Sequence, residues 1–206
     1  MRIGDKARPT DLITVDGERI YIPKRKEFRY IMMNKPRGYV TTLSDEQGRR
    51  CVTDLLGDLD VRVYPVGRLD KNSEGLLLLT NDGAFANGIM HPSREVTKTY
   101  RVTVRPPVSE EQLAQMSVGV TLDDGFQTAP ANIVTKVTEP SRVVLLITIH
   151  EGKKREIRRM CDAVGLEVAR LRRISIGPVK LGMLKPGAWR DLTSEELRAL
   201  RTAIGK

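Results

Sequence analysis

Short runs of β-branched and other apolar residues, separated by Gly, Pro, Asn or Asp, recur along most of the chain. Runs of this length, bounded by turn residues, are typical of strands in a largely antiparallel sheet. The strands predicted in this way span residues 28–34, 61–66, 75–80, 98–104, 131–137, 142–150 and 168–176.

Capping boxes predict two helices among these strands. Ser109 precedes Gln112 by three positions, and Thr193 precedes Glu196 by the same interval. In such a pair each side chain bonds to the main chain of the other residue, which favours the start of a helix. Strands and helices together predict a mixed α/β (α+β) fold.

A third predicted helix, within residues 154–165, has two distinct faces. Arg155, Arg158 and Arg159 fall together on one of them. The other face repeats apolar residues with the helical spacing i, i+3, i+4, i+7, and it consists of Ile157, Met160, Cys161 and Val164. One side is therefore expected to pack against the core while the other presents guanidinium groups.

The beginning of the chain differs from the rest. Residues 1–22 are charged and hold two short β-branched runs around a turn at Asp16, and residues 23–27, PKRKE, have the composition of a linker. The sequence thus predicts a small N-terminal unit, a linker, and one larger domain at residues 28–206.

The chain has 206 residues, of which 40% are apolar, so it can build a core. No apolar run approaches the roughly 20 residues that span a bilayer, and no signal-peptide pattern follows the basic start. Cys and His each occur twice, too few and too isolated for the usual zinc spacings. These features predict a cytoplasmic protein with no membrane partner and argue against a metal site.

Basic residues exceed acidic ones by 35 to 26, a net charge of +9 that favours a polyanionic partner. Arginines are suited to phosphate because each planar guanidinium can bind two oxygens. A basic array predicted to bind nucleic acid consists of Lys153, Lys154, Arg155, Arg158, Arg159, Arg170, Arg172 and Arg173. The alternative is a charged face that is merely solvated.

Aromatic residues make up only 4% of the chain, which argues against a platform that stacks several bases. One or two rings could still hold a single base. Tyr100 falls on the apolar side of residues 98–104 and, taken alone, is typical of a core tyrosine.

A polar triplet precedes four consecutive leucines in the stretch PVGRLDKNSEGLLLLTNDG, residues 65–83. In an extended segment Arg68 and Asp70 point the same way, so the cation favours the ionised carboxylate. Such a carboxylate could be a nucleophile, a general base or half of a structural ion pair. The residues alone favour the ion pair.

This stretch closely resembles the signature of the RsuA/RluB family of ribosomal pseudouridine synthases, in which Gly-Arg-Leu-Asp carries the catalytic aspartate. Three further segments resemble the family in order and spacing: HPSREVTKTYRV (91–102), EGKKREIRRM (151–160) and RLRRISIGPVKLGMLKPGAWRDLT (170–193). The resemblance runs from about residue 28 to residue 206.

The resemblance implies roles for four residues. Asp70 would be the nucleophile, and Tyr100 would pack on the target uracil and assist proton removal from C5. Arg158 would pair with the aspartate, and Arg68 would lie near the extruded base. The family's reaction breaks the N1–C1′ bond of a uridine, turns the base and rejoins it through C5, with no cofactor and no metal.

The resemblance also implies a fold and a substrate. The fold would be a mainly antiparallel mixed sheet in two halves, with flanking helices and a central cleft. Residues 28–206 would be the catalytic domain of a monomer, and residues 1–22 a remnant of an S4-like RNA-binding domain. Lys154 stands where the family often has Asn. RluB-like members match best, so large-subunit ribosomal RNA is expected in preference to small-subunit RNA.

A second hypothesis is a catalytically silent RNA-binding or ribosome-assembly factor on the same scaffold. The presence of Asp70, Tyr100 and Arg158 argues against it, because a binding module has no need of a nucleophile in a cleft.

Overall fold

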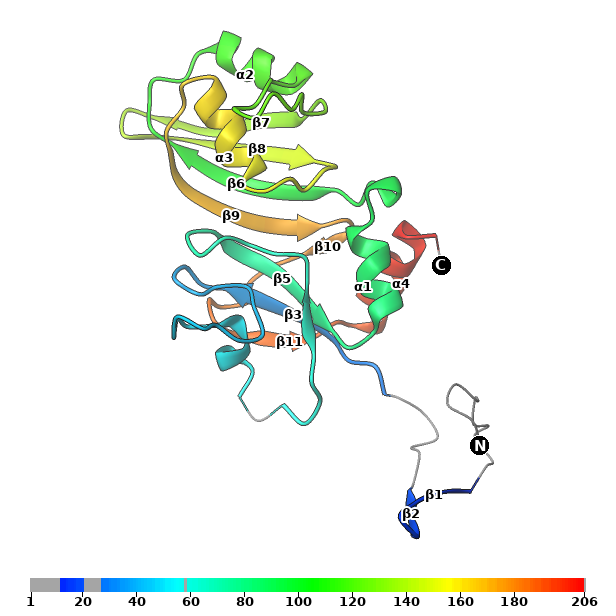
Figure 1. The fold of residues 1–206 in the computed structure, drawn as a ribbon. Helices are drawn as coiled ribbons and strands as arrows, with labels where there is room; N and C mark the ends of the chain where they lie inside the picture. Colours follow the sequence, from blue (N-terminus) through cyan, green and yellow to red (C-terminus); the bar gives the residue numbers. More distant parts are fainter. Residues whose placement is uncertain (1–11, 21–26, 58, 206) are drawn as a thin grey trace.

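The computed structural model describes residues 12–20, 27–57 and 59–205 of the chain (Figure 1). The strands are β1 (Ile13–Val15), β2 (Glu18–Ile20), β3 (Tyr30–Lys35), β4 (Tyr64–Val66), β5 (Glu74–Thr80), β6 (Lys98–Val104), β7 (Asn132–Glu139), β8 (Arg142–Ile149), β9 (Val168–Ile176), β10 (Val179–Lys180) and β11 (Trp189–Asp191). The α-helices are α1 (Gly83–Met90), α2 (Glu110–Val118), α3 (Glu156–Ala163) and α4 (Ser194–Ala203), with short 3-10 helices η1 (Val52–Leu55) and η2 (Pro92–Arg94).

One large mixed sheet of nine strands organises the domain, with the order β11-β3-β5-β9-β6-β8-β7. Strand β4 pairs with β5, and β10 pairs with β9. Every pairing is antiparallel except that of β5 with β9, which is parallel and only two residues long. The prediction of a mainly antiparallel sheet in two halves with flanking helices is confirmed, and the parallel β5–β9 contact is the seam between the halves.

Gly75 makes this seam possible. It pairs with Arg173 across the seam and has a φ of +105°. A Cβ atom added there would lie 2.1 Å from the main-chain oxygen of Arg173. Only glycine combines that backbone conformation with so close an approach of two strands.

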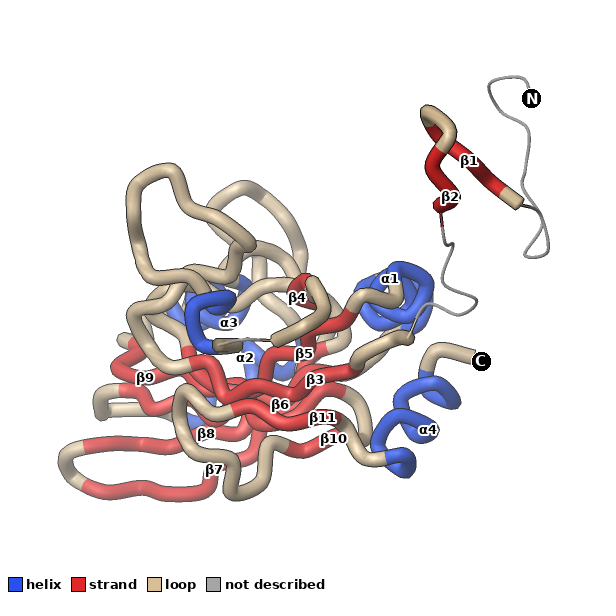
Figure 2. The backbone as a smooth tube through the Cα atoms, turned by 90° about the horizontal axis from the view of Figure 1, so that it is seen from below, coloured by secondary structure: helices blue, strands red, loops and turns tan. Residues whose placement is uncertain are grey.

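The leucines of β5 separate two hydrophobic cores on the two faces of the sheet. Leu77 and Leu79 pack in the larger core, with residues of η1, α2 and α3. Leu76 and Leu78 pack in the smaller core, with residues of α1 and α4. Figure 2 shows α2 and α3 grouped over one part of the sheet and α1 and α4 grouped beside its other end. All four leucines are at most 1% exposed, so β5 is a rigid central strand.

All seven predicted strands and all three predicted helices are present, with shifts of a few residues at most of their ends. Helix α1 and strands β10 and β11 were not predicted. The sequence of α1, GAFANGIM, contains two glycines and an asparagine, which are poor helix formers. The helix begins at an Asp82 cap and is stabilised by burial of Phe85, Ala86 and Ile89.

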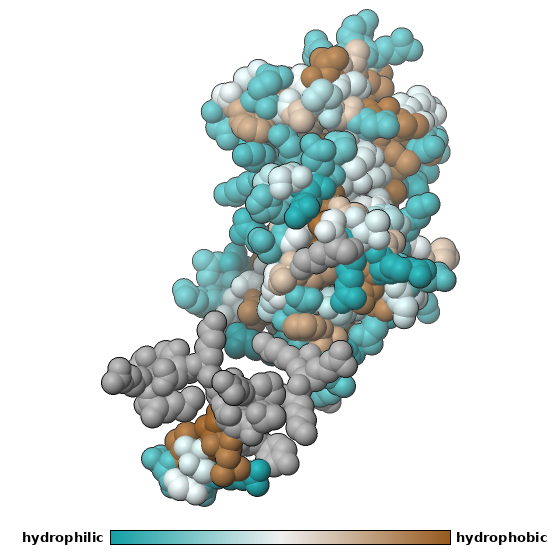
Figure 3. All heavy atoms as spheres, turned by 90° about the vertical axis from the view of Figure 1, so that its right-hand side faces the viewer, coloured by the Kyte–Doolittle hydropathy of each residue, from teal (hydrophilic) through white to brown (hydrophobic). Residues whose placement is uncertain are grey.

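Strands β1 and β2 form a separate two-stranded hairpin. The predicted S4-like remnant at residues 1–22 and the linker at residues 23–27 fall largely outside the described residues. No helix in the described ranges is long and apolar enough to cross a membrane. Seen from the side that carries α1 and α4, hydrophilic and apolar residues are interspersed over the surface (Figure 3).

Candidate active site

A cavity of about 510 Å³ opens where the two halves of the sheet meet. Its walls come from the loop between β4 and β5, from α1, from β6 and β9, and from the segment before α3. Arg68, Asp70 and Tyr100 all line it. The structure therefore brings three of the four predicted catalytic residues to one concave site, as is usual for small-molecule and base-binding pockets.

The loop that carries Asp70 is fixed through its main chain. The carbonyl oxygens of Leu69, Asp70, Lys71, Asn72 and Ser73 each accept a hydrogen bond from outside the loop. The donors, in the same order, are Thr41 Oγ1, Lys35 Nζ, the Gly38 N–H, Arg158 Nη2 and again Lys35 Nζ. Because an unmade hydrogen bond at a buried group costs about 1–3 kcal/mol, this set of contacts favours one loop conformation.

Lys35, the last residue of β3, is the central support of the loop. Its side chain is fully buried, and its ammonium group donates to the carbonyls of Pro36 (3.2 Å), Asp70 (3.0 Å) and Ser73 (2.9 Å). Burial lowers the pKa of Lys35 to about 8, although the carboxylates of Asp70 and Glu74 oppose the decrease. Three acceptors match the three donors of an ammonium group, so the buried cation is fully hydrogen bonded.

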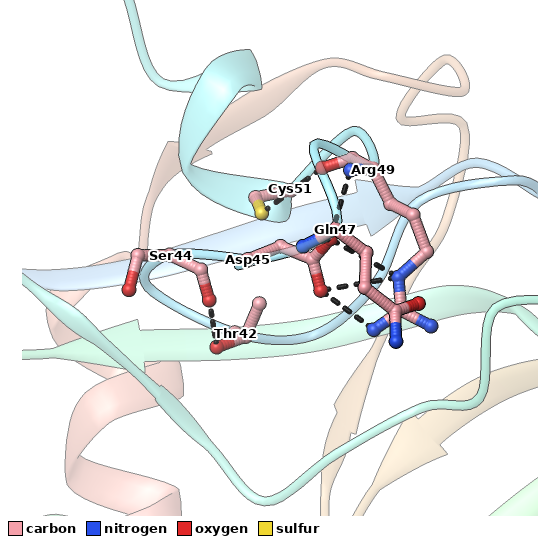
Figure 4. A network of polar contacts seen from close by, with 6 residues as sticks. All are labelled: Thr42, Ser44, Asp45, Gln47, Arg49 and Cys51. Carbon is pink, nitrogen blue, oxygen red and sulfur yellow. Dashed lines mark hydrogen bonds and ion pairs between the residues drawn. The ribbon is translucent and has the colours of Figure 1, made fainter.

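Thr41 braces the same loop, and a hydrogen-bonded turn follows it in the chain. Thr41 Oγ1 donates to the Leu69 carbonyl at 2.7 Å and accepts from the Leu69 N–H at 3.2 Å. In the following turn, Asp45 accepts bonds from the main-chain N–H groups of Gln47 and Arg49 and from the Arg49 guanidinium (Figure 4). The Arg49 bonds lower the pKa of Asp45 to about 2. The segment that carries Thr41 is held next to this turn by Val40, whose N–H donates to the Arg50 carbonyl and whose carbonyl accepts from the Val52 N–H.

Arg158 reaches the Asp70 loop from α3. Its guanidinium donates to the carbonyls of Asn72 (3.1 Å) and Val168 (3.4 Å). Burial and the neighbouring Arg155 lower the pKa of Arg158, whereas the charge of Asp70 raises it. The two groups are therefore electrostatically coupled, but in the described contacts Arg158 bonds to the backbone of the loop and makes no direct bond to the Asp70 carboxylate.

The Asp70 carboxylate makes no hydrogen bond or ion pair within the part of the chain that the structure describes. The same holds for the side chain of Arg68, which is exposed at the cavity. The structural ion pair that the sequence alone favours is thus absent from the described contacts. A half-buried carboxylate beside a cavity is available to a bound molecule.

Tyr100 and Arg173 form the inner wall of the cavity, and they are opposite each other on β6 and β9. Tyr100 is 9% exposed and also packs in the larger core. Arg173 is 5% exposed, and its Nε donates to the Leu76 carbonyl at 2.8 Å. Its Nη2 is buried without a partner among the described residues. Arg173, predicted to bind RNA on a surface, therefore lies inside the site.

Lys153, Lys154 and Arg155 are exposed and line the same cavity. Arg155 is the N-cap of α3 and has a left-handed backbone, with φ 54°. It therefore precedes the helix, and the predicted shared helical face of Arg155, Arg158 and Arg159 is not observed. The three exposed cations instead give the cavity a positively charged border.

Glu156, the first residue of α3, bonds to the main chain of the segment that carries these three cations. It is 4% exposed, and its carboxyl accepts a hydrogen bond from the Lys153 N–H at 2.7 Å. Burial raises the pKa of Glu156 to about 7 against that hydrogen bond, and the nearby Glu151 raises it further while Lys98 lowers it. Burial and the charge of Arg173 lower the pKa of Lys98. Acidic and basic groups with shifted pKa values thus lie together in the cavity wall.

The remaining predicted RNA-binding residues lie elsewhere. Arg159 is held by two carboxylates, Asp123 and Asp124. Arg170 bonds to Glu74 at 2.7 Å. Arg170 and Arg172 line a separate pocket, on the other face of the sheet from Tyr100. The predicted basic array is therefore not one continuous surface.

No group of three or more His, Cys, Asp or Glu side chains that could hold a metal ion occurs among the described residues. The polar groups of the cavity are instead the unpaired Asp70 carboxylate, the buried Glu156 carboxyl, buried and exposed cations, a serine and a tyrosine.

Residues 29–163 match the family described as RNA pseudouridylate synthase. The chain belongs to this family. This match, together with the identity to the relatives named below, confirms the sequence resemblance to RsuA/RluB-type enzymes. The chain is an enzyme of the isomerase class. The match covers the Asp70 loop, Tyr100 and Arg158.

Named relatives agree with this assignment. An uncharacterized RNA pseudouridine synthase of Aquifex aeolicus is 45% identical, with 98% of this chain and 81% of the relative covered. The ribosomal large subunit pseudouridine synthase B of Bacillus subtilis is 39% identical, with 97% and 81% covered. A crystal structure of a pseudouridylate synthase has a TM-score of 0.76 and 32% identity, and the alignment covers 95% of this chain and 83% of that one.

Lys35, Thr41 and Glu156 were missed by the sequence reasoning. A lysine at the end of an apolar strand is most often exposed, and nothing in the pattern YIMMNKPRG distinguishes a buried one. Thr41 and Glu156 likewise have ordinary neighbours in the sequence. The role of Thr41 depends on its bond to Leu69, which is 28 residues away in the sequence.

Proposed function

We propose that this protein converts one uridine of large-subunit ribosomal RNA to pseudouridine, with Asp70 as the nucleophile. The observation that carries the proposal is the unpaired Asp70 carboxylate, on a loop with five anchored carbonyls, beside a cavity with basic walls. The name of the Bacillus subtilis relative supports a large-subunit substrate.

The target base must leave its stack before Asp70 can reach it. Extrusion of a base costs a few kcal/mol and is offset by contacts in the pocket. The exposed Lys153, Lys154 and Arg155 are placed to bind the flanking phosphates. Arg68, also exposed at the cavity, would lie beside the extruded nucleotide.

In the proposed reaction an oxygen of Asp70 bonds either to C1′ of the ribose or to C6 of the uracil. The N1–C1′ bond breaks, and N1 takes its electron pair. The base turns and a bond forms between C5 and C1′. The bond to Asp70 is broken, N1 gains a proton and C5 loses its own, so no atom is gained or lost overall. Tyr100 faces the base and assists removal of that proton.

The protein's charges suit this sequence of steps. The attacking group is a carboxylate, and the positive charges of Lys35 and Arg158 are electrostatically coupled to the charge of Asp70. Negative charge develops on the uracil as N1 leaves, and Lys98 and Arg173 in the cavity wall are placed to stabilise it. A protein that only bound RNA would have no use for an unpaired carboxylate held in this way.

Incubation of the purified protein with separate transcripts of large- and small-subunit ribosomal RNA tests the proposal. Chemical mapping of pseudouridine should locate one new position in the large-subunit transcript. A new position only in the small-subunit transcript would contradict the choice of substrate, and no new position in either RNA would contradict the proposed reaction.

A further inference from the structure

Four arginines gather on the sheet face opposite to α2 and α3. Side chains alternate along a strand, so Arg101 and Thr103 point away from Tyr100 and Val102, which pack in the larger core. A pocket of about 150 Å³ on this outer face is lined by Arg101, Thr103, Arg142, Val144, Arg170 and Arg172. We call its arginines the outer arginine cluster.

Only part of the cluster's charge is balanced within the protein. Arg142 pairs with Glu139 at 2.9 Å, and Arg170 pairs with Glu74 at 2.7 Å. The side chains of the other two, Arg101 and Arg172, have no hydrogen bond or ion pair in the described ranges.

Arg101 and Arg172 are also register partners on the adjacent strands β6 and β9. Like charges directly opposite each other on neighbouring strands destabilise a sheet. Folding therefore does not account for this pair, whereas an anion bound between them would turn the repulsion into a favourable contact.

The chemistry of the cluster fits phosphate. Guanidinium forks bind phosphate oxygens in pairs. The pocket lining has no aromatic side chain on which a base could stack, so contacts to the nucleic-acid backbone are favoured over contacts to bases.

We propose that the outer arginine cluster is a second RNA contact, which binds backbone phosphates of a substrate segment other than the one that carries the target uridine. This inference rests on the proposed function. Arg172 and Arg173 are successive residues of β9, yet the first lines the outer pocket and the second the Asp70 cavity. A short RNA that fills the cavity therefore leaves the cluster empty, while a large folded RNA can contact both faces.

Substitution of both unpaired arginines, Arg101→Gln with Arg172→Gln, tests the inference. Filter binding would compare a long folded ribosomal RNA with a short stem-loop that carries the same uridine. We expect the dissociation constant to rise about tenfold more for the long RNA than for the stem-loop. For the long RNA, the slope of the logarithm of the binding constant against the logarithm of the salt concentration should become shallower by up to about two. The melting temperature should equal or exceed that of the wild type, because a repulsive pair is removed.

A matched control removes the same charge at two other exposed positions, Lys180→Gln with Arg198→Gln, and should leave the ratio of the two dissociation constants unchanged. An unchanged ratio of the two dissociation constants in the arginine variant would overturn the inference. This holds whether both RNAs bind more weakly by the same factor or neither binding changes, the second result being the one expected of a site that binds an acidic protein. Pseudouridine mapping on the same samples separates the two proposals. If the wild type forms no pseudouridine in any RNA, the proposed reaction is excluded. The binding comparison then still decides whether the outer arginine cluster contacts RNA.

Discussion

Lys35 and Asp70 are joined through the main chain: the buried ammonium group of Lys35 donates to the carbonyl oxygen of Asp70 at 3.0 Å. The same ammonium group also bonds to Ser73, so it fixes both ends of the turn that follows the carboxylate. The side chain of Asp70 remains unpaired in the described contacts while its backbone is held. A reactive group on a fixed backbone is the arrangement that favours precise attack on a bound base.

Replacement of Lys35 by methionine should therefore impair the reaction. The protein loses three hydrogen bonds, two of them to the Asp70 loop, but also a buried cation. We therefore expect a net loss of about 1–3 kcal/mol in the free energy of unfolding. We also expect kcat to fall by about 100-fold, because small displacements of a nucleophile are costly. Steady-state kinetics and urea unfolding measure the two effects. Lys71→Met, at an exposed position beside Asp70, is the control, and equal kcat values for the two variants would contradict the role of Lys35.

Arg158 and Arg159 are neighbours on α3 with different contacts. Arg158 bonds to the Asp70 loop and is coupled to the Asp70 charge, whereas Arg159 bonds to Asp123 and Asp124. We expect Arg158→Ala to lower kcat by about 100-fold or more with a modest effect on unfolding, and Arg159→Ala to change kcat by less than about threefold. Single-turnover kinetics would show whether the loss lies in the chemical step. Similar kcat values for the two variants would exclude a specific role for Arg158.

The seam between the two halves of the sheet should not tolerate a side chain at Gly75. A methyl group there meets the main-chain oxygen of Arg173 at 2.1 Å, and the backbone has positive φ. We expect Gly75→Ala to lower the free energy of unfolding by more than about 3 kcal/mol, measured by chemical denaturation. Gly152→Ala is the control, since a Cβ atom at Gly152 meets nothing within 4 Å. A Gly75→Ala protein as stable as the control would show that the strands can separate at little cost.

Glu156 should make folding stability depend on pH. Burial raises its pKa from 4.5 to about 7, so the folded protein holds a proton that the unfolded chain releases. The stabilisation is complete below about pH 4.5 and is lost as the pH rises through about 7. The reference is Glu156→Gln, which keeps an acceptor for the Lys153 N–H. Relative to this variant, the free energy of unfolding of the wild type should fall by up to about 3 kcal/mol between pH 5 and pH 8. Urea unfolding at several pH values checks this. A difference in unfolding free energy between the two proteins that does not change with pH would contradict this prediction. Glu110→Gln, at an exposed position, is the control.

The sequence predicted the sheet well because short alternating strands such as β6 and β9 carry their own pattern, and both span the predicted residues. Through the family resemblance it also predicted that Asp70 and Tyr100 share one site, and both line the cavity; their catalytic roles stay predictions. It failed for α1, because that helix depends on its Asp82 cap and on packing, and its own residues do not favour a helix. Tertiary contacts overrode local preference there.

The basic residues show a second limit of the sequence. Alternation places Arg172 and Arg173 on opposite faces of β9, but only the structure shows that one face borders the cavity and the other an outer pocket. Likewise, nothing near Arg159 in the sequence indicates that Asp123 and Asp124 hold it. Contacts between distant segments decide which charges are available to RNA.

Release of tritium from ribosomal RNA labelled at C5 of uracil tests the central claim most directly, because the label leaves only when C5 loses its hydrogen. The wild type should release label from large-subunit RNA, and Asp70→Asn, which keeps the shape but not the charge, should release none. Asp162→Asn, at an exposed position on α3, should behave as the wild type. Release at the wild-type rate by Asp70→Asn would contradict the assignment of Asp70 as the nucleophile.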